Sequence, residues 1–134
     1  MGFLMDTCVW IDVERGSLAP ADVAALTDSE PIFISPVTLA ELRFGAEKSG
    51  SVRLAGQLEL VLAALPVLPL QPPGDARYAS LRVALERTGE PIGPNDMFIA
   101  AHALALRLTL VTGKVREFSR VPSLKVTNWL RADG

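Results

Sequence analysis

Three short apolar runs, separated by longer helical segments, limit most strongly how this chain can fold. They are Phe3-Leu4-Met5, Ile32-Phe33-Ile34 and the run from Leu108 to Thr112. Each is short and bounded by polar residues, glycine or proline, which is typical of a buried strand. Because strands that alternate with helices usually pair in parallel, we predict a mostly parallel sheet with helices on both faces.

Helix start and stop signals support this architecture. Ser35-Pro36, Ser51 and Gly93-Pro94 are typical of helix starts, and Gly50 and Gly89 fall where helices should end. The predicted strands are 2–6, 32–34, 108–112 and 124–127, with an edge strand or irregular segment at 67–70. The predicted helices are 8–14, 20–28, 35–48, 51–65, 75–88 and 94–107.

Length and composition narrow the class of protein. The 134 residues suit one domain, 1–134, and 49% hydrophobic residues can form a core. The single Cys8 cannot form an internal disulfide, and neither a membrane span nor a secretory signal is visible, so we expect a cytoplasmic protein. A net charge of −2 does not match a dedicated nucleic-acid binder, but it leaves open an enzyme that holds metal ions with acids.

Four acids occupy positions that deserve a functional hypothesis. Asp6 ends the first strand, at the edge where open α/β sheets bind ligands, although an ordinary turn or capping Asp is the better explanation when Asp6 is considered alone. Glu41 shares a helix face with apolar neighbours, which places it at the border of the core or else on the surface. Asp96 lies in a first helical turn, where the dipole favours acids, and Glu117 alone is typical of a solvated loop acid.

The four acids are more informative together. The carboxyl ends of parallel strands and the starts of the following helices share one sheet edge, so Asp6, Glu41, Asp96 and Glu117 can converge there. Asp96 joins them only if helix 94–107 enters from that edge. Clustered carboxylates repel one another unless a cation neutralises them, and oxygen ligands suit Mg²⁺ or Mn²⁺. Such ions catalyse phosphodiester cleavage.

Other chemically capable residues have simpler explanations. His102 lies about 240° round its helix from Asp96, at ~100° per residue, which favours a core or interface histidine. Cys8 is interpreted as a small packing residue, and Trp10 and Trp129 as core anchors. The sequence contains no glycine-rich phosphate-binding motif.

These residues resemble a known family. Leu4-Met5-Asp6-Thr7, the stretch from Ile34 to Gly45, the stretch from Ile92 to Ala103, and Leu110-Val111-Thr112 with Arg116-Glu117-Phe118 are similar, in the same order, to the motifs of PIN-domain ribonucleases. The closest likeness is to the VapC toxins of bacterial toxin–antitoxin pairs.

The resemblance implies a three-layer α/β/α sandwich with a short-stranded sheet and a metal-dependent endoribonuclease that cuts RNA of the tRNA or rRNA class. It implies Asp6, Glu41, Asp96 and Glu117 as catalytic, metal-binding acids, with Mg²⁺ or Mn²⁺ as cofactor. The supporting residues would be Thr112, Thr7 and Lys114. A VapB-like antitoxin and a homodimer are the implied protein partners.

Two departures from the family pattern define the alternatives. Cys8 stands where the family commonly has Asn, and Lys114 stands where it commonly has Asn or Asp. Lys114 could weaken one metal position or contact an RNA phosphate instead, which leaves open a catalytically weakened binding module. A receiver-type phospho-acceptor domain is a further alternative, but the first strand offers a single acid and Val67–Leu70 ends on no Asp.

Overall fold

A computed structural model describes residues 2–14 and 30–128, and in this part of the chain four parallel strands form one sheet in the order β2-β1-β3-β4. The strands are β1 (Phe3–Met5), β2 (Ile32–Phe33), β3 (Thr109–Val111) and β4 (Val126–Thr127). The helices are α1 (Thr7–Glu14), α3 (Pro36–Ser49), α4 (Val52–Ala64), α5 (Gly74–Thr88), α6 (Pro94–Leu106) and α7 (Val115–Phe118).

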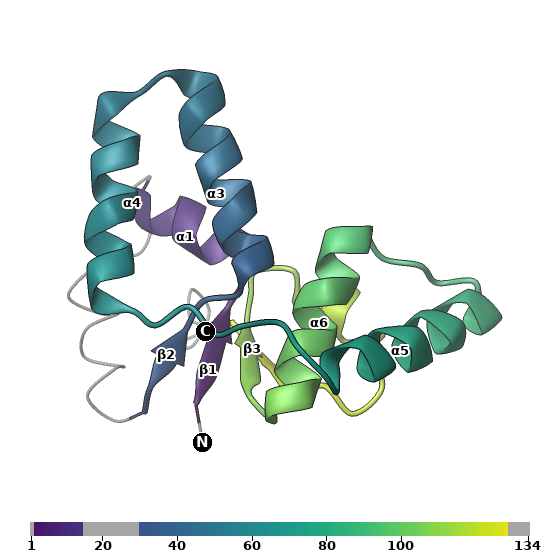
Figure 1. Ribbon diagram of the computed structural model, residues 1–134. Coiled ribbons are helices and arrows are strands. Elements are labelled where there is room, and N and C mark those ends of the chain that lie inside the picture. The colour runs from purple at the N-terminus through teal and green to yellow at the C-terminus, as the bar shows by residue number, and fades with distance from the viewer. Residues whose placement is uncertain (1, 15–29, 129–134) are drawn as a thin grey trace.

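The two faces of the sheet support separate hydrophobic cores. Leu4 pairs with Leu110, and both pack with residues of α5, α6 and α7 on one face. Their neighbours Met5 and Val111 also pair, and they pack with residues of α1, α3 and α4 on the other face. Alternation along the strands therefore separates the two helical layers, which Figure 1 shows on either side of the sheet. The predicted α/β fold with a parallel sheet is confirmed.

The helix boundaries follow from the capping residues. Ser35 accepts a hydrogen bond from the backbone N–H of Val37 at the start of α3, and Ser51 accepts one from Leu54 at the start of α4. Gly50 and Gly89 end α3 and α5 in the left-handed conformation, with φ of 66° and 69°. Glycine adopts this conformation without a steric penalty, so these predicted ends are confirmed.

Some predicted elements differ from the structure or lie outside it. The predicted helix 20–28 and Trp129 lie outside the described residues. The segment 67–70 contributes only an isolated bridge between Val67 and Ile34, because proline at positions 66 and 69 supplies no backbone donor for a longer ladder. Trp10 and His102 are 4% and 1% exposed, which confirms that both are core residues.

The connection between α6 and β3 decides where Asp96 lies. Arg107 ends α6 in the left-handed conformation, and β3 begins only two residues later. A helix that leads so directly into a strand packed against it runs antiparallel to that strand, so its N-terminus lies at the carboxyl edge of the sheet. Asp96 in the first turn of α6 is therefore brought to the edge at which β1 ends in Asp6. None of the helices in the described ranges is long and apolar enough to cross a membrane.

Candidate active site

Asp6 is the central acid of the site and is only 1% exposed. Its Oδ1 accepts a hydrogen bond from the backbone N–H of Thr7 at 2.7 Å, and its Oδ2 accepts one from Thr112 Oγ1 at 2.8 Å. Burial raises the pKa of Asp6 above its ordinary value, and the charge of Asp96 adds to this, while the hydrogen bonds from Thr112, Cys8 and Thr7 oppose it. Asp6 is thus a rigidly oriented, partly desolvated carboxylate.

Asp96 faces Asp6 across a lysine side chain. The Lys114 ammonium donates to Asp96 Oδ2 at 3.2 Å, and the two side chains are 45% and 12% exposed. Burial alone would lower the pKa of Lys114, but the charges of Asp96, Asp6 and Glu117 and the hydrogen bond to Asp96 raise it overall. Lys114 is therefore a permanent positive charge between carboxylates at neutral pH.

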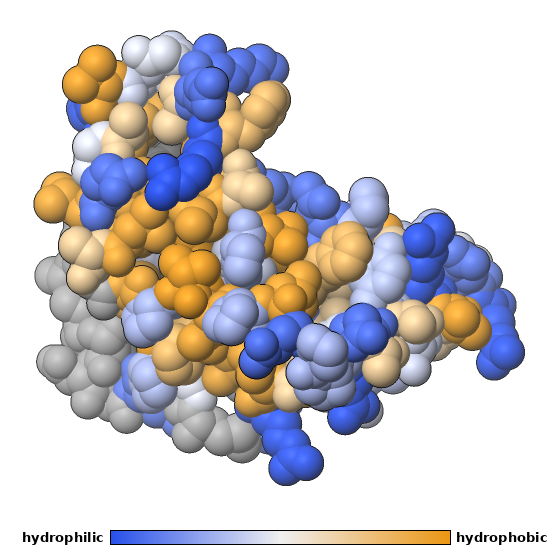
Figure 2. Space-filling model, viewed as in Figure 1, coloured by the Kyte–Doolittle hydropathy of each residue, from blue (hydrophilic) through white to orange (hydrophobic). Residues whose placement is uncertain are grey.

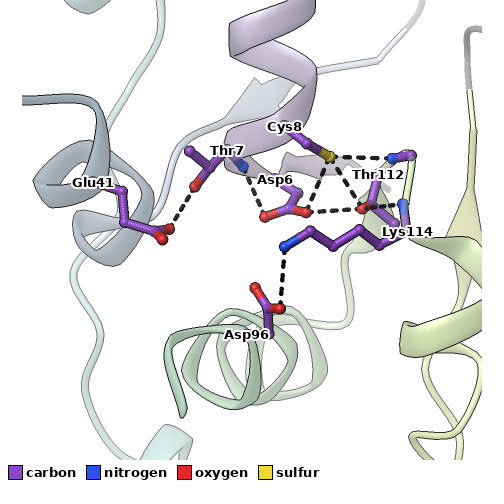
Figure 3. A network of polar contacts seen from close by, with 8 residues as sticks. Asp6, Thr7, Cys8, Glu41, Asp96, Thr112 and Lys114 are labelled. Atoms are coloured by element: carbon purple, nitrogen blue, oxygen red, sulfur yellow. Dashed lines mark hydrogen bonds and ion pairs between the residues drawn. The ribbon is translucent and has the colours of Figure 1, made fainter. Parts of the chain in front are cut away.

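Glu41 reaches the site through Thr7. The Thr7 hydroxyl donates to Glu41 Oε1 at 2.6 Å, while the Thr7 backbone N–H binds Asp6, so this threonine joins the two acids. The side chains of Asp6, Glu41 and Asp96 extend toward one another from β1, α3 and α6 (Figure 3). A groove of about 670 Å³ beside Thr7 and Glu41 continues along α1, α3 and α4.

Thr112 connects the end of β3 to the first acid. Its buried hydroxyl donates to Asp6 and accepts a hydrogen bond from the Lys114 backbone N–H at 2.9 Å. The loop after β3 is therefore held in register with Asp6 through a single hydroxyl. This geometry fits the supporting role predicted for Thr112 and also fixes the origin of the Lys114 side chain.

Cys8 is a residue of the site that the sequence interpretation missed. Its thiol donates to Asp6 Oδ2 at 3.3 Å and accepts a hydrogen bond from the Gly113 backbone N–H at 3.3 Å. Burial, reinforced by the charge of Asp6, raises the pKa of the Cys8 thiol, so it stays a neutral donor. The sequence signals for this role were its position two residues after Asp6, at the start of a helix, and its place where the family commonly has Asn.

Glu117 is connected to the site through its charge on Lys114 rather than through a hydrogen bond to another acid. It is half-buried in the single turn of α7, and its charge acts on Lys114. Within the described residues it makes no hydrogen bond to Asp6, Glu41 or Asp96.

The donor chemistry of the site suits a hard divalent cation. Residues 2–14 and 30–128 contain no group of three or more His, Cys, Asp or Glu side chains close enough together to hold a metal ion by themselves. Mg²⁺, however, commonly binds one or two carboxylates and completes its shell with water and substrate phosphates. The Asp6 and Asp96 carboxylates supply oxygen atoms of this kind, and the Lys114 ammonium pairs with Asp96 and experiences the charge of Asp6.

Comparison with known proteins identifies the family. The PIN domain family model matches residues 3–124. Ribonuclease VapC2 of Rickettsia felis is 34% identical over 132 residues, which cover 96% of this chain and 98% of that protein. The tRNA(fMet)-specific endonuclease VapC of Salmonella typhimurium is 38% identical over 97 residues, covering 72% of this chain and 74% of the relative.

Solved structures agree with the sequence comparison. The crystal structure of VapBC2 from Rickettsia felis, bound to a DNA fragment from their promoter, superimposes with a TM-score of 0.88 at 31% identity. The match covers 96% of this chain and 99% of that chain. The predicted PIN-like architecture and the family resemblance are therefore confirmed, and the chain belongs to the PIN-domain family, among the VapC ribonucleases.

Proposed function

We propose that this protein is a divalent-metal-dependent endoribonuclease toxin, controlled by a VapB-type antitoxin. The observation that carries the proposal is the meeting of Asp6 and Asp96, from β1 and α6, at the carboxyl edge of the sheet with a cation beside them. Relatives named as VapC ribonucleases, and a VapBC structure at a TM-score of 0.88, support it.

Each residue of the site has a distinct task in this proposal. Asp6 and Asp96 would hold Mg²⁺ or Mn²⁺, with Glu41 and Glu117 as additional acids at its border. Once bound, the ion supplies an activated water for attack on the phosphodiester and stabilises the leaving oxygen. Thr112 and the Thr7 backbone orient the two Asp6 oxygens, and Thr7 also orients Glu41. Burial of Asp6 keeps competing water away from this carboxylate.

The substrate proposed is a structured RNA of the tRNA class. A relative at 38% identity is named a tRNA(fMet)-specific endonuclease, which makes initiator tRNA the first RNA to test. The net charge of −2 provides little general attraction for RNA, so recognition depends on local contacts around the site rather than on overall charge.

The proposed antitoxin site is the groove between α1, α3 and α4. Ile11, Leu42 and Leu54 supply apolar walls, and Arg53 and Glu41 supply charge, so the groove fits an amphipathic segment of a small partner protein. Two large hydrophobic residues lie on the surface of these helices: Phe44 in α3 is 66% exposed and Leu60 in α4 is 74% exposed. Figure 2 shows hydrophobic surface across the middle of the molecule in the view of Figure 1. Such surface also supports the proposal of a homodimer.

The test is cleavage of initiator tRNA by the purified protein with Mn²⁺. We expect Asp6→Asn and Asp96→Asn each to lower the cleavage rate by at least about 100-fold, because each removes a charged ligand. Asp75→Asn is the matched control, since Asp75 occupies the first turn of α5 as Asp96 does in α6, but is exposed.

Three results would speak against this function. Cleavage that persists unchanged in EDTA would exclude metal dependence. Equal cleavage by Asp6→Asn and the unmodified protein would remove Asp6 from the site. Failure of the unmodified protein to cleave any RNA, with antitoxin binding intact, would favour the binding module instead.

A further inference from the structure

Lys114 is connected to both Asp6 and Asp96 by hydrogen bonds, indirectly to the first and directly to the second. Its backbone N–H donates to Thr112 Oγ1, the same hydroxyl that donates to Asp6, and its ammonium donates to Asp96 at 3.2 Å. Figure 3 shows the side chain passing beside Asp6 on its way to Asp96. The backbone anchor and the ion pair together place this positive charge between two carboxylates that come from different elements.

The acids around Lys114 need a cation whether or not a metal is bound. Asp6 and Asp96 repel each other, and Asp6 is almost completely removed from water. Carboxylates in such an arrangement either take up a proton or pair with a positive charge. Because an unpaired buried charge is strongly destabilising, the Lys114 ammonium stabilises the folded, metal-free protein.

The same ammonium forms a hydrogen bond to a carboxylate oxygen of Asp96 that a divalent ion would need as a ligand. Its contact is with Oδ2 of Asp96, whose side chain is only 12% exposed and therefore has little freedom to offer its oxygens elsewhere. Lys114 itself is 45% exposed and has a flexible stem, so it can turn toward solvent. A divalent ion and the ammonium cannot both stay close to Asp96 without repelling each other.

We propose that Lys114 is a built-in counter-ion of the Asp6–Asp96 pair and competes with the divalent cation for Asp96. The proposal rests on the metal dependence proposed above. It makes the affinity of the site for metal depend on the release of Lys114, and it gives the protein a stable acid site before any metal binds.

Calorimetric titration with Mn²⁺ tests the competition. We expect Lys114→Met to bind Mn²⁺ about tenfold more tightly than the unmodified protein, equivalent to about 1.4 kcal/mol. Lys114→Arg keeps the charge and should retain the weaker affinity. Lys125→Met is the matched control, because it removes the same charge from an exposed lysine away from the acids. An unchanged or weaker affinity in Lys114→Met would overturn the proposal.

Thermal unfolding with and without metal tests the counter-ion role. In EDTA, Lys114→Met should unfold about 4 °C below the unmodified protein, because the acid pair has lost its cation. In saturating Mn²⁺, Lys114→Met should unfold at the same temperature as the unmodified protein or at a higher one, because the bound ion stabilises the native state. A purely structural lysine would instead lower the unfolding temperature equally in both conditions, and that result would also overturn the proposal.

The two proposals fail in different ways. If no variant binds Mn²⁺, both the metal dependence and the competition are wrong. If the protein binds Mn²⁺ and Asp6→Asn abolishes this binding, while Lys114→Met leaves it unchanged, only the role of Lys114 is wrong.

Discussion

At the scale of single residues, the environment of Asp6 determines how the site responds to mutation and to pH. The carboxylate is buried, and it accepts hydrogen bonds from Thr7, Thr112 and Cys8. Thr7 and Cys8 directly follow Asp6 in the sequence, whereas Thr112 directly follows β3. The orientation of Asp6 consequently depends on the correct pairing of β1 with β3.

Replacement of Thr112 by valine should damage both stability and activity. Thr112→Val removes a donor to a buried carboxylate, so we expect the free energy of unfolding to fall by about 1–3 kcal/mol in urea titrations. Because this hydrogen bond lowers the pKa of Asp6, the acid limb of the activity–pH profile should move to higher pH. Thr109→Val, at the start of the strand that Thr112 follows, should leave that limb in place. A profile unchanged in Thr112→Val would contradict the role given to this hydroxyl.

The raised pKa of Asp6 predicts how stability changes with pH in EDTA. Since the folded state binds the proton of Asp6 more readily than the unfolded state, lowering the pH through this raised pKa stabilises the fold. Asp6→Asn cannot take up this proton. Between about pH 7 and about pH 4, the unmodified protein should therefore gain stability relative to Asp6→Asn. Urea unfolding across this range measures the difference, and a loss in place of the gain would contradict the assignment.

A site residue could be predicted from the sequence when the pattern that indicates its role lies close to it in the chain. Asp6 and Asp96 stand at element ends that caps and apolar runs reveal. Their meeting depended in addition on the direction in which α6 enters, which the sequence left open and the structure provides. Cys8 has a local partner in Asp6, but a small packing residue fits that position equally well, and its other partner, Gly113, lies 105 residues away and leaves no local pattern. The contact of Lys114 with Asp96 depends on side-chain direction, which sequence spacing does not encode.

At the scale of elements, the start of α3 links helix stability to the site. Ser35 is buried and caps the helix that carries Glu41. Ser35→Ala should lower the free energy of unfolding by about 1 kcal/mol and weaken Mn²⁺ binding, because Glu41 is then held less firmly. Ser51→Ala removes a similar cap from α4, and it should lower stability without changing Mn²⁺ affinity. Equal Mn²⁺ affinities in the two variants would exclude this link.

Helix ends that carry a capping residue were predicted within one or two residues, because Ser35, Ser51, Gly50 and Gly89 determine local hydrogen bonding. Strands were less exact. β2 and β4 contain two residues each, since their ends depend on where neighbouring strands stop pairing rather than on their own composition. Val83 in α5 is 46% exposed, whereas Leu81 and Leu85 form the buried face of this helix.

At the scale of the whole molecule, one sheet separates two cores. We expect Leu85→Ala, in the core formed with α5 and α6, to cost about 2–5 kcal/mol. Trp10 belongs to the opposite core. In a Trp129→Phe background, Trp10 is the remaining tryptophan, so its fluorescence reports on this opposite core. If the sheet unfolds as one unit, Leu85→Ala should lower the urea midpoint of Trp10 fluorescence and that of far-UV circular dichroism to the same value. Separate midpoints would show that the two layers unfold independently.

The parallel pairing of β1 with β3 also has a consequence for protein synthesis. Asp6 emerges from the ribosome early, but Thr112, which orients it, is 106 residues farther along the chain, and Asp96 and Lys114 are also late. The acid pair and its lysine cannot assemble until these late residues have been released. A nascent chain therefore lacks the proposed acid site until Asp96, Thr112 and Lys114 have all left the ribosome.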